Sequence, residues 1–200
     1  MSQFSDRLFR IYTSELPANG SVLISRPFLE DSNFTRSVVL MIDCENESGD
    51  ALGVILNRPL DLGINDAISG IDLPGNPTLY LGGPVGQDRL VVVHTLGEEI
   101  IPDSLPLGEG LWAGGDFEAV KEYVRGGGET DGFIKLLVGY SGWGEGQLAK
   151  ELDEGTWAVG QLDVSEMMGP GGPDMWKEAV SRLDKRYDFW KRLPRKSSLN

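Results

Sequence analysis

Residues 21–56 contain three short β-rich runs in succession: SVLIS at 21–25, SVVLMI at 37–42 and ALGVIL at 51–56. Clusters of Pro, Asn, Asp and Gly separate the runs, as expected of turns between strands. The connection at 43–50, DCENESGD, is predicted to close a hairpin. Because these strands follow one another before helices take over, strict β-α-β alternation fails. The sequence favours an α+β fold with a mostly antiparallel or mixed sheet.

Outside this stretch, apolar runs alternate with Gly-rich or Pro-rich breaks. Strands are predicted at 78–81, 89–94, 133–140 and 157–162, with one short strand at most between Leu105 and Gly115. Helices are predicted at 4–16, 64–69 and 147–152, and after Asp116, which suits an N-cap position, with Gly126–Gly128 closing that helix. A Gly-rich turn, SGWGEG, is expected after the strand at 133–140. At 200 residues the chain suits a single domain, 1–200.

A last helix is predicted at about 173–192, since Pro173 suits the first helical turn. It is amphipathic, with one stripe formed by Trp176, Val180, Leu183, Tyr187 and Trp190. Residues 185–200 hold six Lys or Arg and one Asp, a net charge of +5. Such a helix would suit a nucleic acid or an anionic membrane. Docking against the domain is favoured, because cations in a last turn complement the helix dipole and the aromatic stripe requires a core to cover.

The chain carries 18 Lys and Arg against 31 Asp and Glu, so its net charge is −13. An anionic surface repels phosphate backbones, which disfavours direct nucleic-acid binding. The single cysteine, Cys44, cannot form an internal disulfide, which suits a reducing compartment. The first residues lack the layout of an export signal, and the longest apolar runs fall far short of the roughly 18 residues of a spanning helix. We therefore expect a cytoplasmic protein with no membrane span.

The usual catalytic patterns each lack a required member. Cys44 and His94, the single residues of their types, lie in separate segments, so no metal site is expected. The sequence around Ser141 reads GYSGW, with Trp where a nucleophile elbow needs its closing Gly. His94 ends an apolar strand, where a hydrogen-bonded structural role is more common than catalysis.

A dinucleotide-binding turn is the closest match to a cofactor motif. Gly144-x-Gly146-x-x-Ala149 follows a strand and opens a helix, and Asp163 lies 19 positions beyond Gly144. However, Glu145 would repel the phosphates, the helix is short, and no further β-α-β pattern follows. A tightly packed turn is the favoured interpretation, and no cofactor is predicted.

Several short motifs occur together along the chain. They are RPF at 26–28, Asp31 with Phe34, RSVV at 36–39, GVILNRP at 53–59, GGPV at 82–85, HT at 94–95 and GYSGWGEGQLAKEL at 139–152 with Trp157. In this order, from about residue 20 to residue 159, the chain resembles the YqgE/AlgH family. The resemblance implies a bacterial, intracellular protein with a strongly curved, partly barrel-like sheet flanked by helices. It implies no established reaction, although some members are labelled transcriptional regulators.

The family's polar and glycine-rich positions fall at predicted strand ends. They are Asn57, Arg58, Gly82, Gly83, Arg89, His94, Tyr140, Ser141, Trp143 and Gln147. Glycines allow close backbone approach and Arg offers a fixed fork for an anion, so these ends are expected to converge on one shallow ligand site. The alternative, that they are turns and buried hydrogen-bond networks, is at least as well supported. Many family members place a His in the connection that here reads CEN at 44–46, which leaves His94 as the lone histidine for shared chemistry.

We rank three functions by how well the sequence supports them. The first is a non-catalytic binding or regulatory protein that acts through protein partners or a small ligand, because every catalytic pattern is incomplete. The second is an enzyme or carrier for a small anionic molecule held by Arg58, Arg89 and the glycine turns. The third is direct DNA binding through the basic tail. It ranks last because a net charge of −13 with +5 on residues 185–200 leaves −18 on the remainder.

Overall fold

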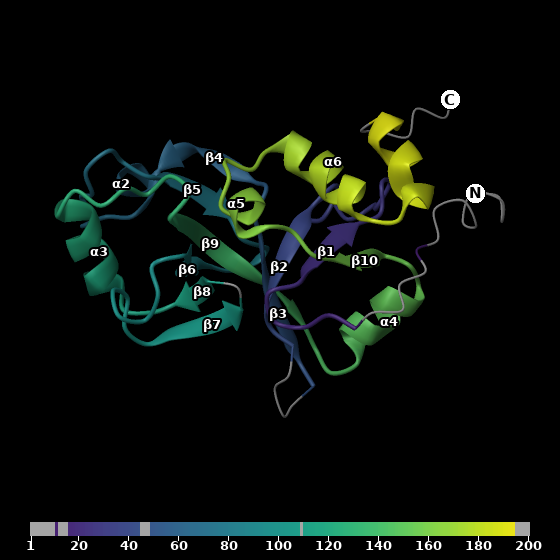
Figure 1. Cartoon of the computed structure of the whole chain (residues 1–200), viewed down its shortest axis with the longest axis horizontal. Helices are drawn as coiled ribbons and strands as arrows, with labels where there is room; N and C mark the ends of the chain where they lie inside the picture. Colours follow the sequence, from purple (N-terminus) through teal and green to yellow (C-terminus); the bar gives the residue numbers. More distant parts are fainter. Residues whose placement is uncertain (1–10, 12–15, 45–48, 109, 195–200) are drawn as a thin grey trace.

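The computed structural model describes residue 11 and residues 16–44, 49–108 and 110–194. The described chain forms one curled β-sheet with helices on both faces (Figure 1). The α+β prediction is therefore confirmed. The main path of the sheet runs in the order β10 (Trp157–Gly160), β1 (Val22–Ser25), β2 (Val38–Asp43), β3 (Ala51–Ile55), β9 (Ile134–Trp143), β6 (Val85–His94), β8 (Leu111–Gly114) and β7 (Ser104–Gly108). Apart from Ile11, the predicted helix at 4–16 lies outside the described residues.

Strand β9 is the spine of the sheet. Along its first half it pairs in parallel with β5 (Thr78–Leu81), which in turn pairs with β4 (Pro59–Gly63). Along its second half it pairs antiparallel with β3, and its opposite edge pairs antiparallel with β6. The sheet therefore divides at β9 into two branches, and its pairing is mixed but mostly antiparallel, as predicted.

The β1–β3 branch is buried on both faces. Val38 and Leu40 of β2 face a large core shared with the C-terminal helices, while Val39 and Met41 face a second cluster. Helix α4 (Gln147–Asp153) covers that second cluster with Leu148 and Leu152. Burial on two faces explains why the run SVVLMI is apolar throughout rather than alternating.

The other branch is covered by α3 (Phe117–Arg125) and by the short α2 (Ile64–Ala67). Val120 and Val124 of α3 pack in a third cluster with Leu136 of β9. The predicted N-cap is present, since the Asp116 carboxylate accepts a hydrogen bond from the Glu118 amide at 2.9 Å. No helix within the described ranges is long and apolar enough to cross a membrane.

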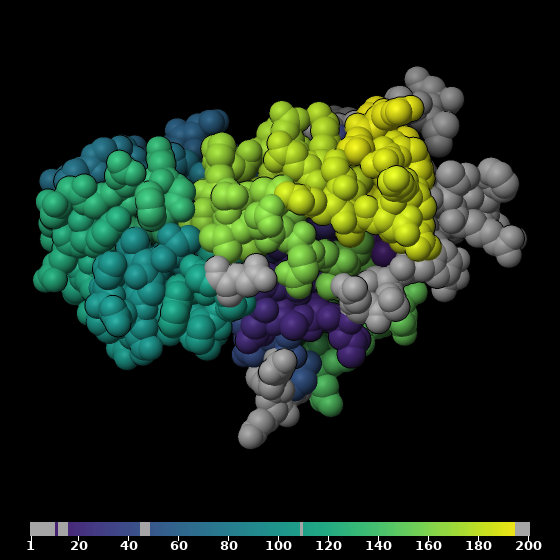
Figure 2. All heavy atoms as spheres, viewed as in Figure 1, coloured from purple at the N-terminus to yellow at the C-terminus, as the bar shows by residue number. Residues whose placement is uncertain are grey.

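The C-terminal helix begins at Pro173 as predicted, but its α-helical part, α6, ends at Arg182. Leu183 is extended, and Asp184 caps a following 3-10 segment, η1 (Lys185–Arg192). A preceding turn of helix, α5 (Val164–Met167), was not predicted. Figure 2 shows this part of the chain, coloured from green to yellow, lying over the middle and one end of an elongated molecule.

The break in the last helix leaves its apolar stripe intact. Trp176, Val180 and Trp190 have no exposed surface and belong to the large core. The Trp176 and Trp190 rings stack with centroids 6.4 Å apart. The stripe therefore docks against the sheet, as predicted.

Two strand predictions need correction. Residues 104–114 form the two-stranded β7–β8 hairpin rather than one short strand. Pro106 is tolerated there because β7 is an edge strand, and Pro59 is tolerated as the first residue of β4. Strand β9 continues through Ser141 and Trp143, where a turn was predicted, because Gly139 adopts a left-handed φ of 71° and pairing then resumes with β3.

Candidate functional site

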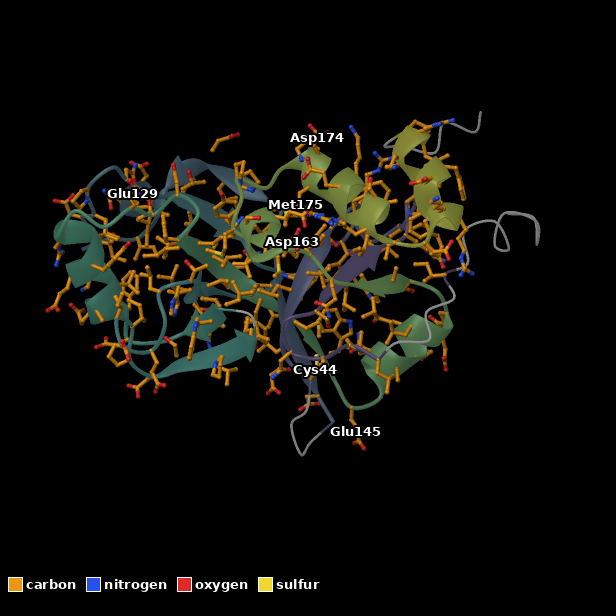
Figure 3. All side chains as sticks on the ribbon, viewed as in Figure 1. Cys44, Glu129, Glu145, Asp163, Asp174 and Met175 are labelled. Carbon is orange, nitrogen blue, oxygen red and sulfur yellow. The ribbon has the colours of Figure 1, made fainter. Side chains whose placement is uncertain are left out.

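A surface pocket of about 720 Å³ opens where three segments meet. The β1–β2 connection supplies residues between Phe28 and Arg36, the β3–β4 junction supplies Asn57–Pro59, and the start of α6 supplies Gly172 and Pro173. In Figure 3 the labelled side chains of Asp174 and Met175 mark the first turn of α6, next to this pocket. The pocket thus unites the start of α6 with two segments that lie more than 110 positions earlier in the sequence.

The charge of the pocket differs from that of the molecule. Its described lining includes two cationic residues, Arg36 and Arg58, and one acidic residue, Glu30, whereas the chain as a whole carries −13. Gly172 and Pro173 at the start of α6 also line the pocket, which brings the positive end of the helix dipole to it, while the Asp174 carboxylate in the first turn pairs with Lys177 at 2.8 Å. The pocket is therefore suited to an anionic group.

The two arginines also hold the pocket together. The Arg58 guanidinium donates to the carbonyl oxygens of Thr35 and Ser32 at 3.2 and 3.4 Å. The Arg36 guanidinium is buried, donates to the carbonyl oxygens of Leu193 and Pro194 and lies 4.8 Å from the Trp176 ring centroid. Arg36 thereby anchors the end of η1 to the pocket wall.

Asn57 forms the buried back of the pocket. Its side-chain oxygen accepts from the Val38 amide at 3.0 Å, and its amide group donates to the Arg36 carbonyl at 2.9 Å and to the Gly172 carbonyl at 3.4 Å. These bonds tie all three walls to one side chain. Asn57 therefore combines the two roles that the sequence left open, since it lines the pocket and also completes a buried network.

A lysine that sequence reasoning missed lies behind the same walls. Lys135 of β9 is 1% exposed, and its ammonium donates to the carbonyl oxygens of Gly169 at 2.7 Å and Leu56 at 3.3 Å. Its nitrogen lies 4.2 Å from the Tyr80 ring centroid. Burial lowers the pKa of Lys135 to about 8. The available signal was a single charge inside the apolar run FIKLLVGY.

The glycine pair at 82–83 forms a close backbone crossing outside the pocket lining. A Cβ atom on Gly82 would overlap the Gly139 carbonyl, and one on Gly83 would overlap the Tyr140 carbonyl. The Ser141 hydroxyl donates to the Gly82 carbonyl at 3.3 Å. Arg89 is exposed on β6, where it flanks Gly86 together with the Tyr140 ring. The contacts at these glycines are those of backbone packing.

Trp143 and Gln147 belong to a separate network centred on Glu151 of α4, a residue that sequence reasoning missed. The indole nitrogens of Trp143 and Trp157 donate to one carboxylate oxygen of Glu151 at 2.9 and 2.7 Å. Gln147 donates to the other oxygen at 2.9 Å. With Phe34, whose ring lies edge-on to Trp157 at 5.4 Å, these residues pack α4 against β9 and β10.

The dinucleotide-like turn is engaged in local structure. The Gly144 amide donates to the side-chain oxygen of Gln147 at 3.2 Å. Asp163, the counterpart of a ribose-binding acid, forms a capping box with Glu166 and pairs with Arg182 at 2.7 Å. These contacts assign the turn to local structure, but the expected tight packing at its glycines is wrong, because a Cβ atom at Gly144 or Gly146 would meet no atom within 4 Å.

His94 is buried at the end of β6, away from the pocket lining. The Leu96 amide donates to Nδ1 at 3.3 Å, so the ring proton lies on Nε2, which donates to the Ser104 hydroxyl at 2.9 Å. That hydroxyl donates onward to the Ile101 carbonyl at 2.5 Å. Both ring nitrogens are thus used within the protein. Within the described residues, no group of three His, Cys, Asp or Glu side chains could hold a metal ion.

Of the ten residues predicted to share a site, Asn57 and Arg58 line the pocket. The others fall into the glycine crossing, the Glu151 network and the His94 hydrogen bonds described above. Arg36, within the quoted motif RSVV, lines the pocket but was not among the predicted site residues.

The fold and the pocket together define a class of α+β protein in which a curled sheet and the start of a C-terminal helix enclose an arginine-lined surface pocket. The chain belongs to the AlgH-like family, whose sequence profile matches residues 22–188. The family suggested by the short motifs is thereby confirmed.

Relatives and solved structures agree with this assignment. A UPF0301 protein of Bacteroides thetaiotaomicron is 40% identical over 194 residues, covering 96% of this chain and 97% of that protein. A UPF0301 protein of Streptomyces avermitilis is 34% identical, covering 90% and 94%. A crystal structure from Corynebacterium diphtheriae superposes with a TM-score of 0.73 at 28% identity, covering 94% of this chain and 99% of that one. The solution structure of the AlgH protein from Pseudomonas aeruginosa gives 0.68 at 27% identity, covering 86% and 93%.

Proposed function

We propose that this chain is a non-catalytic, regulatory binding protein that holds a small anionic ligand in the pocket beside Arg58. The observation that carries the proposal is the placement of Arg36 and Arg58 against a single acid, Glu30, in a pocket of a strongly anionic chain. Arg binds carboxylates and phosphates through paired hydrogen bonds. A volume of about 720 Å³ lies in the range of small-molecule sites.

The non-catalytic part of the proposal rests on which groups line the pocket. Its described lining includes no His, Cys or Lys side chain, and His94 is buried elsewhere. Glu30, Ser32 and Thr35 line the pocket and are of types that can act in catalysis, but the described lining offers no His or Lys to activate them near neutral pH. Binding without turnover suits a cytoplasmic protein whose ligand is a signal passed to protein partners.

The proposal is tested by thermal shift with a panel of anions: sulfate, inorganic phosphate, citrate and nucleoside monophosphates. A ligand at 100 times its Kd stabilises the folded state by about 2.7 kcal/mol, which raises the Tm of a chain of this size by about 5 °C or more. We expect such a shift in the wild type and its loss in Arg58→Ala. The matched control is Arg89→Ala, which removes an exposed arginine outside the pocket lining.

Two results would contradict the proposal. Equal shifts in the wild type and Arg58→Ala, or none with any anion, would remove the pocket as a binding site. Chemical conversion of a bound anion by purified protein, lost in Arg58→Ala, would show an enzyme instead of a binding protein.

A further inference from the structure

Lys135 is a buried cation that has no acidic partner among the described residues. No carboxylate of the described residues forms a salt bridge with its ammonium, which has two carbonyl oxygens and the Tyr80 ring as neighbours. Removing an ammonium from water without an anion is unfavourable, and an apolar side chain of similar size would be the ordinary choice in a buried strand. Such departures from ordinary burial are concentrated at functional positions.

The two carbonyls that Lys135 holds lie in chain segments that lead into two walls of the pocket, at Asn57 and at Gly172. Leu56 directly precedes Asn57, and Gly169 begins the loop that ends at Gly172. Asn57 itself donates to the Gly172 carbonyl at 3.4 Å. A closed ring therefore lies behind the pocket. It consists of Lys135, the β3–β4 junction and the loop at 169–172, joined by these three hydrogen bonds.

The backbone of the loop at 169–172 packs closely against the other members of this ring. Gly171 has a left-handed φ of 73°, and a Cβ atom there would lie 2.8 Å from the Leu56 carbonyl oxygen. The Tyr80 hydroxyl donates to the Pro170 carbonyl at 3.2 Å. Three carbonyls of a four-residue loop are thus held by side chains, those of Lys135, Tyr80 and Asn57.

We infer that Lys135 is a positioning residue of the anion pocket: its ammonium holds the Asn57 wall and the Gly172 wall at the spacing that the ligand requires. The inference rests on the proposed function and goes further, because it makes a residue outside the pocket lining control ligand affinity. With Lys135 uncharged, its hydrogen bonds to the Gly169 and Leu56 carbonyls are weaker, because a neutral amine is a poorer donor than an ammonium, and the pocket loses a nearby positive charge.

The groups around Lys135 set the sign of a pH effect. Burial lowers the pKa of Lys135 to about 8. Burial, and then the charge of Asp131, raise the pKa of Tyr80. The charged residues that line the pocket in front are Arg36, Arg58 and Glu30. Lys135 loses its proton between pH 7 and 9, so anion affinity is expected to fall as the pH rises through this interval.

The test uses sulfate, whose charge is constant over this range, and measures its Kd by calorimetry at pH 7 and pH 9. We expect wild-type affinity to fall severalfold across the interval. Lys135→Met should bind about 10-fold more weakly at pH 7 and show no fall, while its Tm is equal to or above that of the wild type. The matched control is Lys150→Met, which removes an exposed lysine of α4.

A second variant keeps the test decisive if Lys135→Met does not fold. Tyr80→Phe retains the ring beside Lys135 but removes the hydrogen bond to Pro170, and it should weaken sulfate binding about 3-fold. Sulfate affinity and pH dependence equal to the wild type in Lys135→Met, with binding lost in Arg58→Ala, would overturn this inference alone. Absence of sulfate binding to the wild type would overturn this inference together with an Arg58 sulfate site.

Discussion

At the scale of single residues, His94 shows how burial fixes a charge state. Both ring nitrogens are used in hydrogen bonds that suit the neutral ring, and burial lowers the pKa of His94 below its ordinary value of 6.5. In the unfolded chain the ordinary value returns. Between the two values the unfolded chain binds more protons, so the contribution of neutral His94 to stability is complete above about pH 6.5 and is lost as the pH falls toward the folded pKa.

The direction of this change of stability with pH is checked by urea unfolding at pH 7.5 and pH 5.5. Replacing His94 with Gln keeps a donor near the Ser104 hydroxyl but removes the titration. We expect the wild type to lose more of its free energy of unfolding between the two pH values than His94→Gln does. Because the acidic groups titrate equally in both proteins, the comparison isolates the histidine; equal losses would show that His94 is not held neutral.

Residue type alone indicated which groups are suited to anions and which to hydrogen bonds, but it did not predict their partners. Arg58 was correctly placed at a strand end, yet the sequence joined it with Arg89, whereas the structure joins it with Arg36 in the pocket. Glu151 was not predicted because its two indole donors come from β9 and β10, 14 positions apart. Such partners depend on which strands become neighbours, and spacing along the chain does not contain that information.

At the scale of elements, the link from β5 to β6 depends on two glycines. The Gly82 amide donates to the Val138 carbonyl at 2.8 Å, and the Gly82 carbonyl accepts from the Ile55 amide at 2.8 Å. This residue therefore bridges β9 and β3, where the two branches of the sheet meet. A side chain at the next position, Gly83, would occupy the space of the Tyr140 carbonyl.

Gly83→Ala is accordingly expected to lower the free energy of unfolding by about 3 kcal/mol, because backbone rather than a flexible side chain must move. Gly144→Ala is the control, since no atom lies within 4 Å of a Cβ placed there, and it should change stability by less than about 0.5 kcal/mol. Both values come from urea unfolding. If Gly83→Ala kept the wild-type free energy of unfolding but lost ligand binding, the glycine pair at 82–83 would belong to the binding site.

Element positions were predictable where burial follows a simple period and were missed where backbone geometry overrides composition. The apolar runs of β1, β2 and β3 gave correct strands because both of their faces are covered. The hairpin of β7 and β8 was missed because Pro106 and the surrounding glycines are typical of turns, and an edge strand accepts them. The single long C-terminal helix was wrong because its apolar stripe continues across the bend at Leu183.

At the scale of the whole molecule, the basic C-terminal segment is partly neutralised by its own neighbours. Arg186 pairs with Asp184 at 3.1 Å and Lys191 pairs with Asp188 at 2.8 Å. Exposed pairs of this kind add little stability, but they reduce the positive field that a phosphate backbone would meet. Residues 184–200 hold six Lys or Arg and two Asp, a net charge of +4, so DNA binding through this segment stays the third-ranked prediction.

The single-domain prediction has a measurable consequence, because the three apolar clusters are built on shared strands. Strand β2 sends alternate side chains into the cores on its two faces, and β9 carries Leu137 in the large core and Leu136 beneath α3. No cluster can lose its packing without disturbing a strand that another requires.

We therefore expect one cooperative urea transition, with coincident midpoints by tryptophan fluorescence and far-ultraviolet circular dichroism. Val120→Ala, beneath α3, should lower both midpoints equally although four of the five tryptophans, Trp143, Trp157, Trp176 and Trp190, belong to other clusters. Leu148→Ala, beneath α4, is the matched change in another cluster. A Val120→Ala variant whose fluorescence midpoint stays at the wild-type value while its circular dichroism midpoint falls would show two independently folding units.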